Sequence, residues 1–190
     1  MPSLAAPALP PGTMADREQP EIHANDLRLR LWQPGDREAV TTAYADPAIQ
    51  RWHARSMTDD EASTWIANWP RRWSAETGAG WAVVDGDKMA GQISLRLIDL
   101  QDGRAEVSYW VLPHARGRRT ASRALQALTE WSFGTLGLHR IEVLHSTANE
   151  PSCRVATAAG YGLEGTKRSE AKHADGWHDM HLHARIVGDR

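Results

Sequence analysis

The sequence predicts an α/β protein whose mixed, mostly antiparallel sheet of about seven strands is covered by helices on both faces. Segments of alternating or β-branched apolar residues, separated by Gly- and Asp-rich turns, are typical of strands. Segments with apolar residues three and four positions apart, preceded by Asp or Thr, are typical of capped helices. One strand, Arg104 to Val111, precedes a long helical pattern and a further strand, Arg140 to Leu144. That order allows one parallel strand pair.

The first third of the chain predicts one strand and three helices. Residues 27–32 alternate Leu and Arg, which indicates a half-exposed strand. Asp36 is the expected N-cap of a helix over 37–44, and Asp46-Pro47 opens a second helix that ends near Trp52. The capping box Thr58 to Glu61 opens the third helix.

This third helix carries three tryptophans at a spacing of four residues: Trp65, Trp69 and Trp73. This spacing places them on one helical face. Core packing is the main interpretation, and an aromatic wall of a binding pocket is the alternative. Pro70 is expected to kink or stop the helix.

The rest of the chain predicts six strands and two helices. A meander is expected over 81–84, 89–98 and 104–111, with turns at Asp85–Asp87 and Gln101–Gly103. A long helix is expected from Thr120 to Leu136, because Ala124, Leu125 and Leu128 share one stripe and Gly137 can end it. After the strand 140–144 comes a short helix, and residues 162–187 form a strand pair turned near Asp175.

The composition indicates an ordinary globular protein. The chain has 190 residues, of which 41% are hydrophobic and 24% charged, and a formal net charge of −2. Nucleic-acid-binding domains usually carry a strongly basic face, so no nucleic-acid partner is expected. The single cysteine, Cys153, excludes an intrachain disulfide and favours a cytoplasmic setting. No apolar run approaches the roughly 20 residues that span a bilayer, so no membrane partner is expected.

Residues 1–20 are expected to be a disordered leader, followed by a single domain over residues 21–190. Met1 to Gly12 is rich in Ala and Pro and has no charged side chain. It lacks the basic start and the continuous apolar segment of a signal peptide. Met14 is an alternative start, because the folded pattern begins after it.

A basic turn connects the strand 104–111 to the long helix. It reads Arg116, Gly117, Arg118, Arg119, Thr120 and Ala121. Free backbone N–H groups and the positive end of the helix dipole favour an anion at such a helix N-terminus. The three arginines add positive charge for phosphate groups. A solvated basic turn is the alternative.

The order strand, basic turn, helix, strand, Asn-x-x-Ser and helix resembles the acetyl-CoA-binding core of the GNAT N-acetyltransferase superfamily. The family pattern is Arg/Gln-x-x-Gly-x-Gly/Ala, and its amides hold the CoA pyrophosphate. Arg116 and Ala121 match the first and last positions, and Arg119 stands where glycine is usual. The resemblance implies a GNAT-type sheet, acetyl-CoA as co-substrate, and divergence of the strands 104–111 and 140–144 at the end of the first.

The same resemblance implies the contacts to the pantetheine arm, which would add to the open strand edge. Backbone groups of Tyr109, Trp110 and Val111 would hold it and polarise the thioester carbonyl. Asn149 would hydrogen-bond it, since an amide both donates and accepts. Ser152 would lie near the sulfur and serve as the acid for the leaving thiolate. Asn149 is also a natural helix N-cap, and Ser152 a first-turn serine.

Glu106 is the candidate general base. Only a neutral amine attacks a thioester, so some group must accept a proton, and an α-amine (pKa ~8) needs less help than a lysine (~10.4). Residues 105–110 resemble a stretch of the RimJ/RimL branch, which includes ribosomal-protein alanine N-acetyltransferases and in which a glutamate is a proposed base. That resemblance covers about residues 25 to 187. The alternative is a strand-edge carboxylate paired with Arg104 or Arg96.

No metal site is expected. Four histidines crowd the C-terminal region: His173, His178, His181 and His183. His181 and His183 share a strand face, which a metal site would need, but no paired carboxylate or thiolate pattern accompanies them. Solvated strand histidines are therefore expected. Cys153 is expected to be a small buried hydrophobe without a local base. His145 and Tyr109 are secondary candidates for proton transfer or substrate contact.

These observations predict an N-acetyltransferase that moves an acetyl group from acetyl-CoA to a primary amine by direct attack in a ternary complex. The acceptor stays open between a protein N-terminus, as the branch resemblance implies, and a small amine such as an aminoglycoside-like or peptide antibiotic. A non-catalytic acyl-CoA sensor is the alternative, because Arg119 departs from the family pattern. A monomer or a homodimer is expected.

Overall fold

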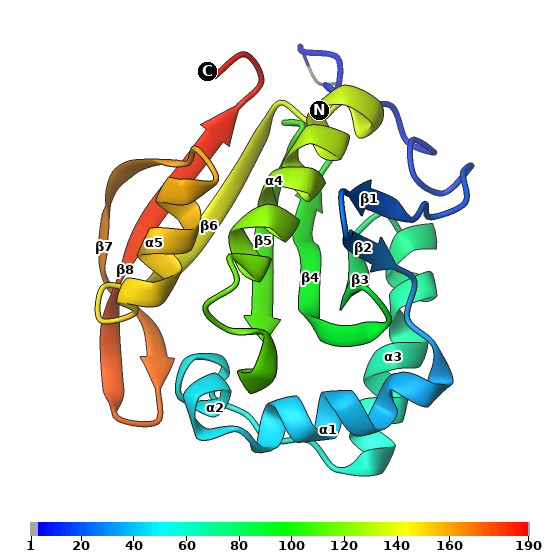
Figure 1. Ribbon diagram of the computed structural model, residues 1–190. Coiled ribbons are helices and arrows are strands. Elements are labelled where there is room, and N and C mark those ends of the chain that lie inside the picture. Colours follow the sequence, from blue (N-terminus) through cyan, green and yellow to red (C-terminus); the bar gives the residue numbers. More distant parts are fainter. Residues whose placement is uncertain (1–3, 190) are drawn as a thin grey trace.

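The computed structural model describes residues 4–189 and is built on one eight-stranded sheet, with the order β1-β2-β3-β4-β5-β6-β8-β7 (Figure 1). All neighbouring strands are antiparallel except β5 and β6, which run parallel. The predicted mixed, mostly antiparallel sheet is confirmed. The strands are β1 (Ile22–Ala24), β2 (Leu27–Arg30), β3 (Gly78–Asp85), β4 (Lys88–Asp99), β5 (Arg104–Val111), β6 (Arg140–Ser146), β7 (Gly162–His173) and β8 (Gly176–Ile186).

The strand beyond the expected seven is β1, which forms a hairpin with β2. Ile22 is the register partner of Leu29, and Asn25 in the turn has a φ of +55°. Asparagine tolerates this left-handed conformation better than most residues, so the chain can reverse within two residues. A strand of three residues is too short for an alternating pattern to be recognised.

The helices cover both faces of the sheet, as predicted (Figure 1). They are α1 (Arg37–Ala45), α2 (Pro47–His53), α3 (Asp59–Ser74), α4 (Thr120–Trp131) and α5 (Glu150–Ala158). The larger core lies between the sheet and α4 and includes Val107 of β5 and Leu128. The smaller core includes Val40 of α1, Ile66 of α3 and Trp110 of β5. Val107 and Trp110 differ in parity along one strand, so the two cores lie on opposite faces.

The predicted end of the long helix is confirmed with one local difference. After α4, one wider, π-helical turn (η3, Ser132–Leu136) leads to Gly137, whose φ is +90°. None of the helices within residues 4–189 has the length and apolar character that crossing a bilayer requires.

The sequence predicts that Pro70 kinks or stops the third helix, and the structure shows that Pro70 does not stop it. Helix α3 continues to Ser74, and Pro70 lies on its exposed side. Trp69 and Trp73 are buried, and Gly80 of β3 leaves the space that the Trp69 ring occupies. Packing of these large side chains on the sheet offsets the backbone hydrogen bond that proline cannot donate. The tryptophan stripe is therefore core.

The expectation of a disordered leader is corrected for residues 8–20, which pack on the domain. Leu9 and Met14 are buried, and Trp73 Nε1 and Trp81 Nε1 each donate to backbone carbonyls of this segment at 2.8 Å. The Glu76 carboxylate accepts hydrogen bonds from the N–H groups of residues 12, 14 and 15. These partners lie more than 50 residues away along the chain, so the Ala/Pro-rich composition alone gave no sign of them. The first three residues of the predicted leader lie outside the described residues.

Candidate active site

The site begins where β5 and β6 separate. Their parallel register runs from Arg104↔Arg140 to Val107↔Val143 and then stops, while β5 stays paired with β4 as far as Val111. The predicted divergence of the two strands is confirmed. The backbone of β5 beyond Val107 therefore has an edge without a strand partner on the β6 side, and an extended ligand can pair with such an edge.

A cavity of about 850 Å³ occupies this opening. Both faces of the sheet contribute to it, because Glu106 and Tyr109 both line it although they point to opposite sides of β5. The opening is thus a passage through the sheet. Helix α2, the basic turn, the end of β6, the start of α5 and part of β7 complete the lining.

Two of the three predicted backbone positions face this opening. The carbonyl of Tyr109 accepts from His53 Nε2 at 3.3 Å, and the carbonyl of Val111 accepts from Arg116 Nε at 3.2 Å. The Trp110 carbonyl instead lies against Gly91 of β4, where a Cβ atom would come within 2.3 Å of it. The Trp110 carbonyl is therefore turned away from the cavity, while its neighbours can exchange a side-chain partner for a ligand.

His53 is one of the cavity residues that the sequence did not indicate. Burial lowers its pKa to about 4, and the positive charges of Arg55 and Arg96 act in the same direction. The ring is therefore neutral at physiological pH. The carbonyl of Tyr109 can only accept, so Nε2 carries the hydrogen.

The basic turn has the backbone of an anion cradle. Gly117 has a φ of +77° and Arg119 a φ of +58°, and no side chain caps the start of α4. The Thr120 hydroxyl donates instead to the Ala115 carbonyl at 3.0 Å. The first N–H groups of α4 are left for a ligand. Arg119 thus adopts the left-handed conformation that glycine normally supplies, at a backbone cost of about 1 kcal/mol.

The three arginines of the turn, all expected to add positive charge for phosphates, differ in their surroundings, and Arg116 lines the cavity. The Arg116 guanidinium bonds to Asp46 at 3.0 Å, and Asp46 is also the N-cap of α2. Arg116 therefore ties the turn to α2. Within residues 4–189, the side chains of Arg118 and Arg119 have neither an ion pair nor a hydrogen bond, and of these two only Arg119 lines the cavity.

A pair of hydroxyl groups lies on the α5 side of the passage. Tyr109 Oη and Ser152 Oγ are 2.6 Å apart, and burial raises the pKa of Tyr109 to about 12, although its hydrogen bond with Ser152 acts in the opposite direction. Tyr109 therefore keeps its proton. Asn149 Oδ1 accepts from the backbone N–H of Ser152 at 3.2 Å, so Asn149 is the N-cap of α5. Its amide N–H₂ group remains for a ligand, and both roles predicted for Asn149 are compatible.

Glu106 lies on the other side of the passage and is paired with Arg96 at 3.5 Å, as the structural alternative predicted. Its side chain is 25% exposed. Because it also lines the cavity, the ion pair does not remove it from the site. A second carboxylate, Glu170 of β7, lines the same cavity and is paired with Lys167 at 3.1 Å. Glu170 lies where the β7–β8 register shifts, an irregularity with no sequence signal.

A chain of polar contacts runs from the cavity to the turn of the β7–β8 hairpin. Ser146 Oγ lies 2.7 Å from His178 Nδ1, and His178 Nε2 lies 2.8 Å from Asp175 Oδ1. The His178 hydrogen bond lowers the pKa of the Asp175 carboxyl. Ser146 lines the cavity, so the chain connects it to the β7–β8 hairpin.

The expectation of solvated strand histidines is wrong for His183, which is 2% exposed, and His145 of β6 is 4% exposed. The local sequence around Cys153 offers no base, but the fold brings His183 Nε2 to 3.7 Å from its sulfur. Local sequence does not predict this contact, because Cys153 and His183 are 30 positions apart.

Comparison with known proteins gives consistent results. Residues 26–162 match the family described as an acetyltransferase (GNAT) domain. The N-acetyltransferase p20 of Bacillus licheniformis is 26% identical over 155 residues, which are 80% of this chain and 87% of that protein. The ribosomal-protein-serine acetyltransferase of Escherichia coli is 32% identical over 101 residues, 53% of this chain and 56% of that protein.

Solved structures share the fold. The ribosomal L7/L12 alpha-N-protein acetyltransferase RimL, in complex with coenzyme A, superposes with a TM-score of 0.81 at 20% identity. The superposition covers 90% of this chain and 100% of RimL. The microcin C7 self-immunity acetyltransferase MccE, in complex with acetyl-CoA and AMP, superposes with a TM-score of 0.77 at 18% identity. This superposition covers 86% of this chain and 93% of MccE.

Proposed function

We propose that this chain, which belongs to the GNAT acetyltransferase family, acetylates the α-amine of a protein or peptide N-terminus by direct attack of the amine on acetyl-CoA. The observation that carries this proposal is the passage between β5 and β6, because an open strand edge, an uncapped helix N-terminus and a hydroxyl pair meet there.

The residues around the passage fit acetyl-CoA. The first N–H groups of α4 and the Arg119 guanidinium suit the pyrophosphate. The backbone of Tyr109 and Val111 and the amide of Asn149 suit the pantetheine arm, which has the alternating donors and acceptors of an extended peptide. Acetyl-CoA supplies an activated acyl group, and the protein supplies position and proton transfer.

The reaction requires one proton to leave the amine and one to reach sulfur. As the amine nitrogen bonds to the acetyl carbon, the carbon–sulfur bond breaks and its electron pair stays on sulfur. Glu106 accepts the amine proton through water, and Ser152 with Tyr109 donates a proton to the thiolate. Because Glu106 and Ser152 lie on opposite sides of β5, amine and sulfur approach from opposite ends of the passage.

Direct attack is favoured over an acyl-cysteine route by the position of Cys153. Its sulfur lies beside His183 beneath α5, and Cys153 is not among the residues that line the cavity. Ser152, its neighbour, does line the cavity. A thioester bound there would meet the serine hydroxyl rather than the cysteine thiol.

The choice of an α-amine as the acceptor rests on chemistry and on the relatives. An α-amine, with a reference pKa of ~8, loses its proton to a weak base far more readily than a lysine at ~10.4. The E. coli relative is named for acetylation of a ribosomal protein, and RimL for an α-N-protein acetylation.

An acetylation assay tests the proposal. Acetyl-CoA is offered with Ser- or Ala-initiated peptides, with the same peptides blocked at the N-terminus but carrying a lysine, and with small polyamines and aminoglycosides. Mass shift and thiol release are recorded together. Peptides with a free N-terminus should be modified fastest. If the small amines are modified faster, the acceptor is a small amine rather than a peptide N-terminus. Tight acetyl-CoA binding without modification of any amine would identify a non-catalytic sensor.

A further inference from the structure

Four metal-binding side chains meet beneath helix α5, next to the cavity. His145 comes from β6, Cys153 from α5, and His181 and His183 from β8. His145 is the register partner of His181 and Val143 that of His183, so the three imidazoles lie on the face of the sheet that α5 covers. One potential ligand atom from each of the four residues lies within 4.8 Å of the others.

The hydrogen bonds of the cluster leave its metal-binding nitrogens free. His145 Nδ1 donates to the Ser146 carbonyl at 2.8 Å, which leaves Nε2 with the lone pair. That Nε2 is buried and has no hydrogen-bond partner among residues 4–189, and the same holds for His181 Nδ1. His183 Nδ1 donates to the Tyr161 carbonyl at 3.4 Å, so its lone pair on Nε2 points toward the Cys153 sulfur.

This pattern differs from that of an ordinary buried histidine. A buried polar atom normally finds a partner, and two in one cluster do not. Histidines that bind metals commonly donate their other ring N–H to a backbone carbonyl, as His145 and His183 do. Three nitrogen donors and one thiol are a ligand set that zinc prefers.

We propose that His145, Cys153, His181 and His183 bind one Zn²⁺ ion in a closed tetrahedral site. Zn–N bonds of about 2.0 Å and a Zn–S bond of about 2.3 Å place tetrahedral ligand atoms roughly 3.3–3.6 Å apart. The 3.7 Å between Cys153 Sγ and His183 Nε2 is close to that spacing. Small side-chain rotations bring in the others. The imidazoles bind as neutral rings, and the thiol loses its proton to solvent as the Zn–S bond forms.

The zinc site connects three elements whose residues line the cavity, β6, α5 and β8. Cys153 follows Ser152 on α5, and His145 itself lines the cavity at the end of β6. With four protein ligands, the ion keeps no position for a substrate. Its role is to hold the start of α5 against β6 and β8, and so to position Ser152.

Untagged wild-type protein, stripped of metal with a chelator and reduced, provides the first test. Zn²⁺ is titrated against a chromophoric competitor, and reaction of the thiol with a disulfide reagent is followed with and without the metal. Cys153 is the only cysteine, so the thiol reaction reports on this site alone. We expect one Zn²⁺ per chain, a raised Tm, release of one proton and at least tenfold slower thiol reaction. Co²⁺ should give tetrahedral visible bands and a thiolate charge-transfer band.

Matched variants complete the test. Cys153→Ser should abolish the charge-transfer band, and His181→Asn should weaken Zn²⁺ binding at least a hundredfold. His23→Ala, at an exposed histidine of β1, should bind like the wild type. Failure of wild-type protein to bind stoichiometric Zn²⁺, or a thiol reaction that zinc does not slow, would overturn the proposal even if no variant folds. None of these readouts uses acetyl-CoA, so the site and the acetylation are tested separately.

Discussion

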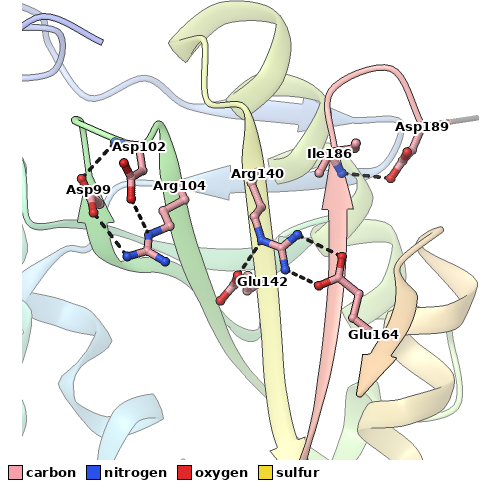
Figure 2. Close-up of polar contacts among 8 residues, drawn as sticks. All are labelled: Asp99, Asp102, Arg104, Arg140, Glu142, Glu164, Ile186 and Asp189. Atoms are coloured by element: carbon pink, nitrogen blue, oxygen red, sulfur yellow. Dashed lines mark hydrogen bonds and ion pairs between the residues drawn. The ribbon is translucent and has the colours of Figure 1, made fainter. Parts of the chain in front are cut away.

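The two ends of the β5–β6 strand pair differ in how their backbone and charges are used. At the end where pairing begins, Arg104 and Arg140 are direct register partners, and carboxylates surround both (Figure 2). Arg104 is paired with Asp99 at 3.5 Å and with Asp102 at 3.7 Å. At the other end the ladder stops after Val107, and the cavity takes its place.

We call the end at which β5 and β6 are paired the closed end, and the end at which they separate the open end. At the closed end, two positively charged side chains lie on neighbouring strands. Arginines directly opposite one another repel, so each needs its own acids. Arg140 bonds to Glu142 at 2.6 Å and makes two contacts with the Glu164 carboxylate (Figure 2). These contacts raise the pKa of the Arg140 guanidinium and lower that of Glu164. Both arginines there are paired with carboxylates of the protein itself.

The open end keeps its charge and backbone groups for a ligand. Arg119 has no partner within residues 4–189, and only side chains meet the carbonyls of Tyr109 and Val111. At the closed end of this strand pair, the arginines and the backbone groups have partners within the protein. At the open end, Arg119 and part of the β5 backbone are left for a ligand. Substitutions at the open end should change ligand binding and turnover, whereas substitutions at the closed end should change stability alone.

The largest effect is expected from the hydroxyl pair at the open end. Tyr109→Phe and Ser152→Ala should each lower kcat about a hundredfold, because the leaving thiolate loses its proton donor. Their 2.6 Å contact makes them one unit, so the double variant should lose much less than the product of the two single losses. Thiol release under saturating acetyl-CoA measures kcat, and calorimetry should show nearly unchanged acetyl-CoA affinity.

Tyr161→Phe is the matched control for this pair. Tyr161 Oη lies 2.6 Å from Thr129 Oγ1, a second buried tyrosine–hydroxyl contact, but Tyr161 does not line the cavity. Its loss should lower Tm and spare kcat. Equal kcat losses in Tyr161→Phe and Tyr109→Phe would mean that both hydroxyls act only through stability.

The next effect concerns the pH dependence of stability, through His53. The pKa of His53 is about 4 in the folded protein, against 6.5 unfolded. As pH falls through this window the unfolded chain binds the proton first, so stability is full above about pH 6.5 and is lost toward pH 4. The loss is at most about 3 kcal/mol. Basic groups that face the ring and oppose its protonation are Arg55, Arg96 and His173.

His53→Gln separates this titration from the hydrogen bond, because glutamine can still donate to the Tyr109 carbonyl but does not titrate. Urea unfolding at a series of pH values should give a flatter stability profile for the variant than for the wild type. Parallel profiles would show that His53 takes up its proton without unfolding.

Glu106→Gln should lower turnover by roughly 30-fold with little change in acetyl-CoA affinity. The loss should be greatest at low pH, where the amine is hardest to deprotonate. Glu142→Gln is the control, because Glu142 is the register partner of Glu106 but does not line the cavity. If Glu170→Gln lowers turnover more than Glu106→Gln does, Glu170 of β7 rather than Glu106 is the general base.

A smaller effect is expected at the anion cradle. Arg119→Glu should weaken acetyl-CoA binding about tenfold and reduce the dependence of binding on salt, because a phosphate contact becomes repulsive. Arg118→Glu, in the same turn but outside the cavity lining, should have less effect. Arg119→Gly loses the charge but keeps the left-handed backbone. If Arg119→Gly binds like the wild type, the backbone amides rather than the guanidinium hold the phosphates.

The sequence predicted those parts of the site whose partners are close along the chain. The basic turn and the Asn-x-x-Ser segment from Asn149 to Ser152 can be recognised from a few consecutive residues, and the structure places both at the cavity. The contact of Arg116 with Asp46 spans 70 residues, and that of His53 with Tyr109 spans 56. Such pairs depend on which strands become neighbours. For the same reason the cluster beneath α5 was missed, because β6, α5 and β8 each contribute only part of it.

The smallest effect is expected at the closed end, from Arg140→Met. Methionine keeps the stem of the side chain but leaves Glu142 and Glu164 without their cation. Their lost pairing is partly offset because Arg104 no longer faces a like charge. Unfolding free energy should fall by about 1 kcal/mol, the usual size for a partly exposed ion-pair group. Since the register of β5 and β6 also depends on backbone pairing, kcat and acetyl-CoA affinity should stay at the wild-type level. A variant with wild-type stability but a lower kcat would show that the closed end controls the width of the passage, and would remove the separation of roles between the two ends.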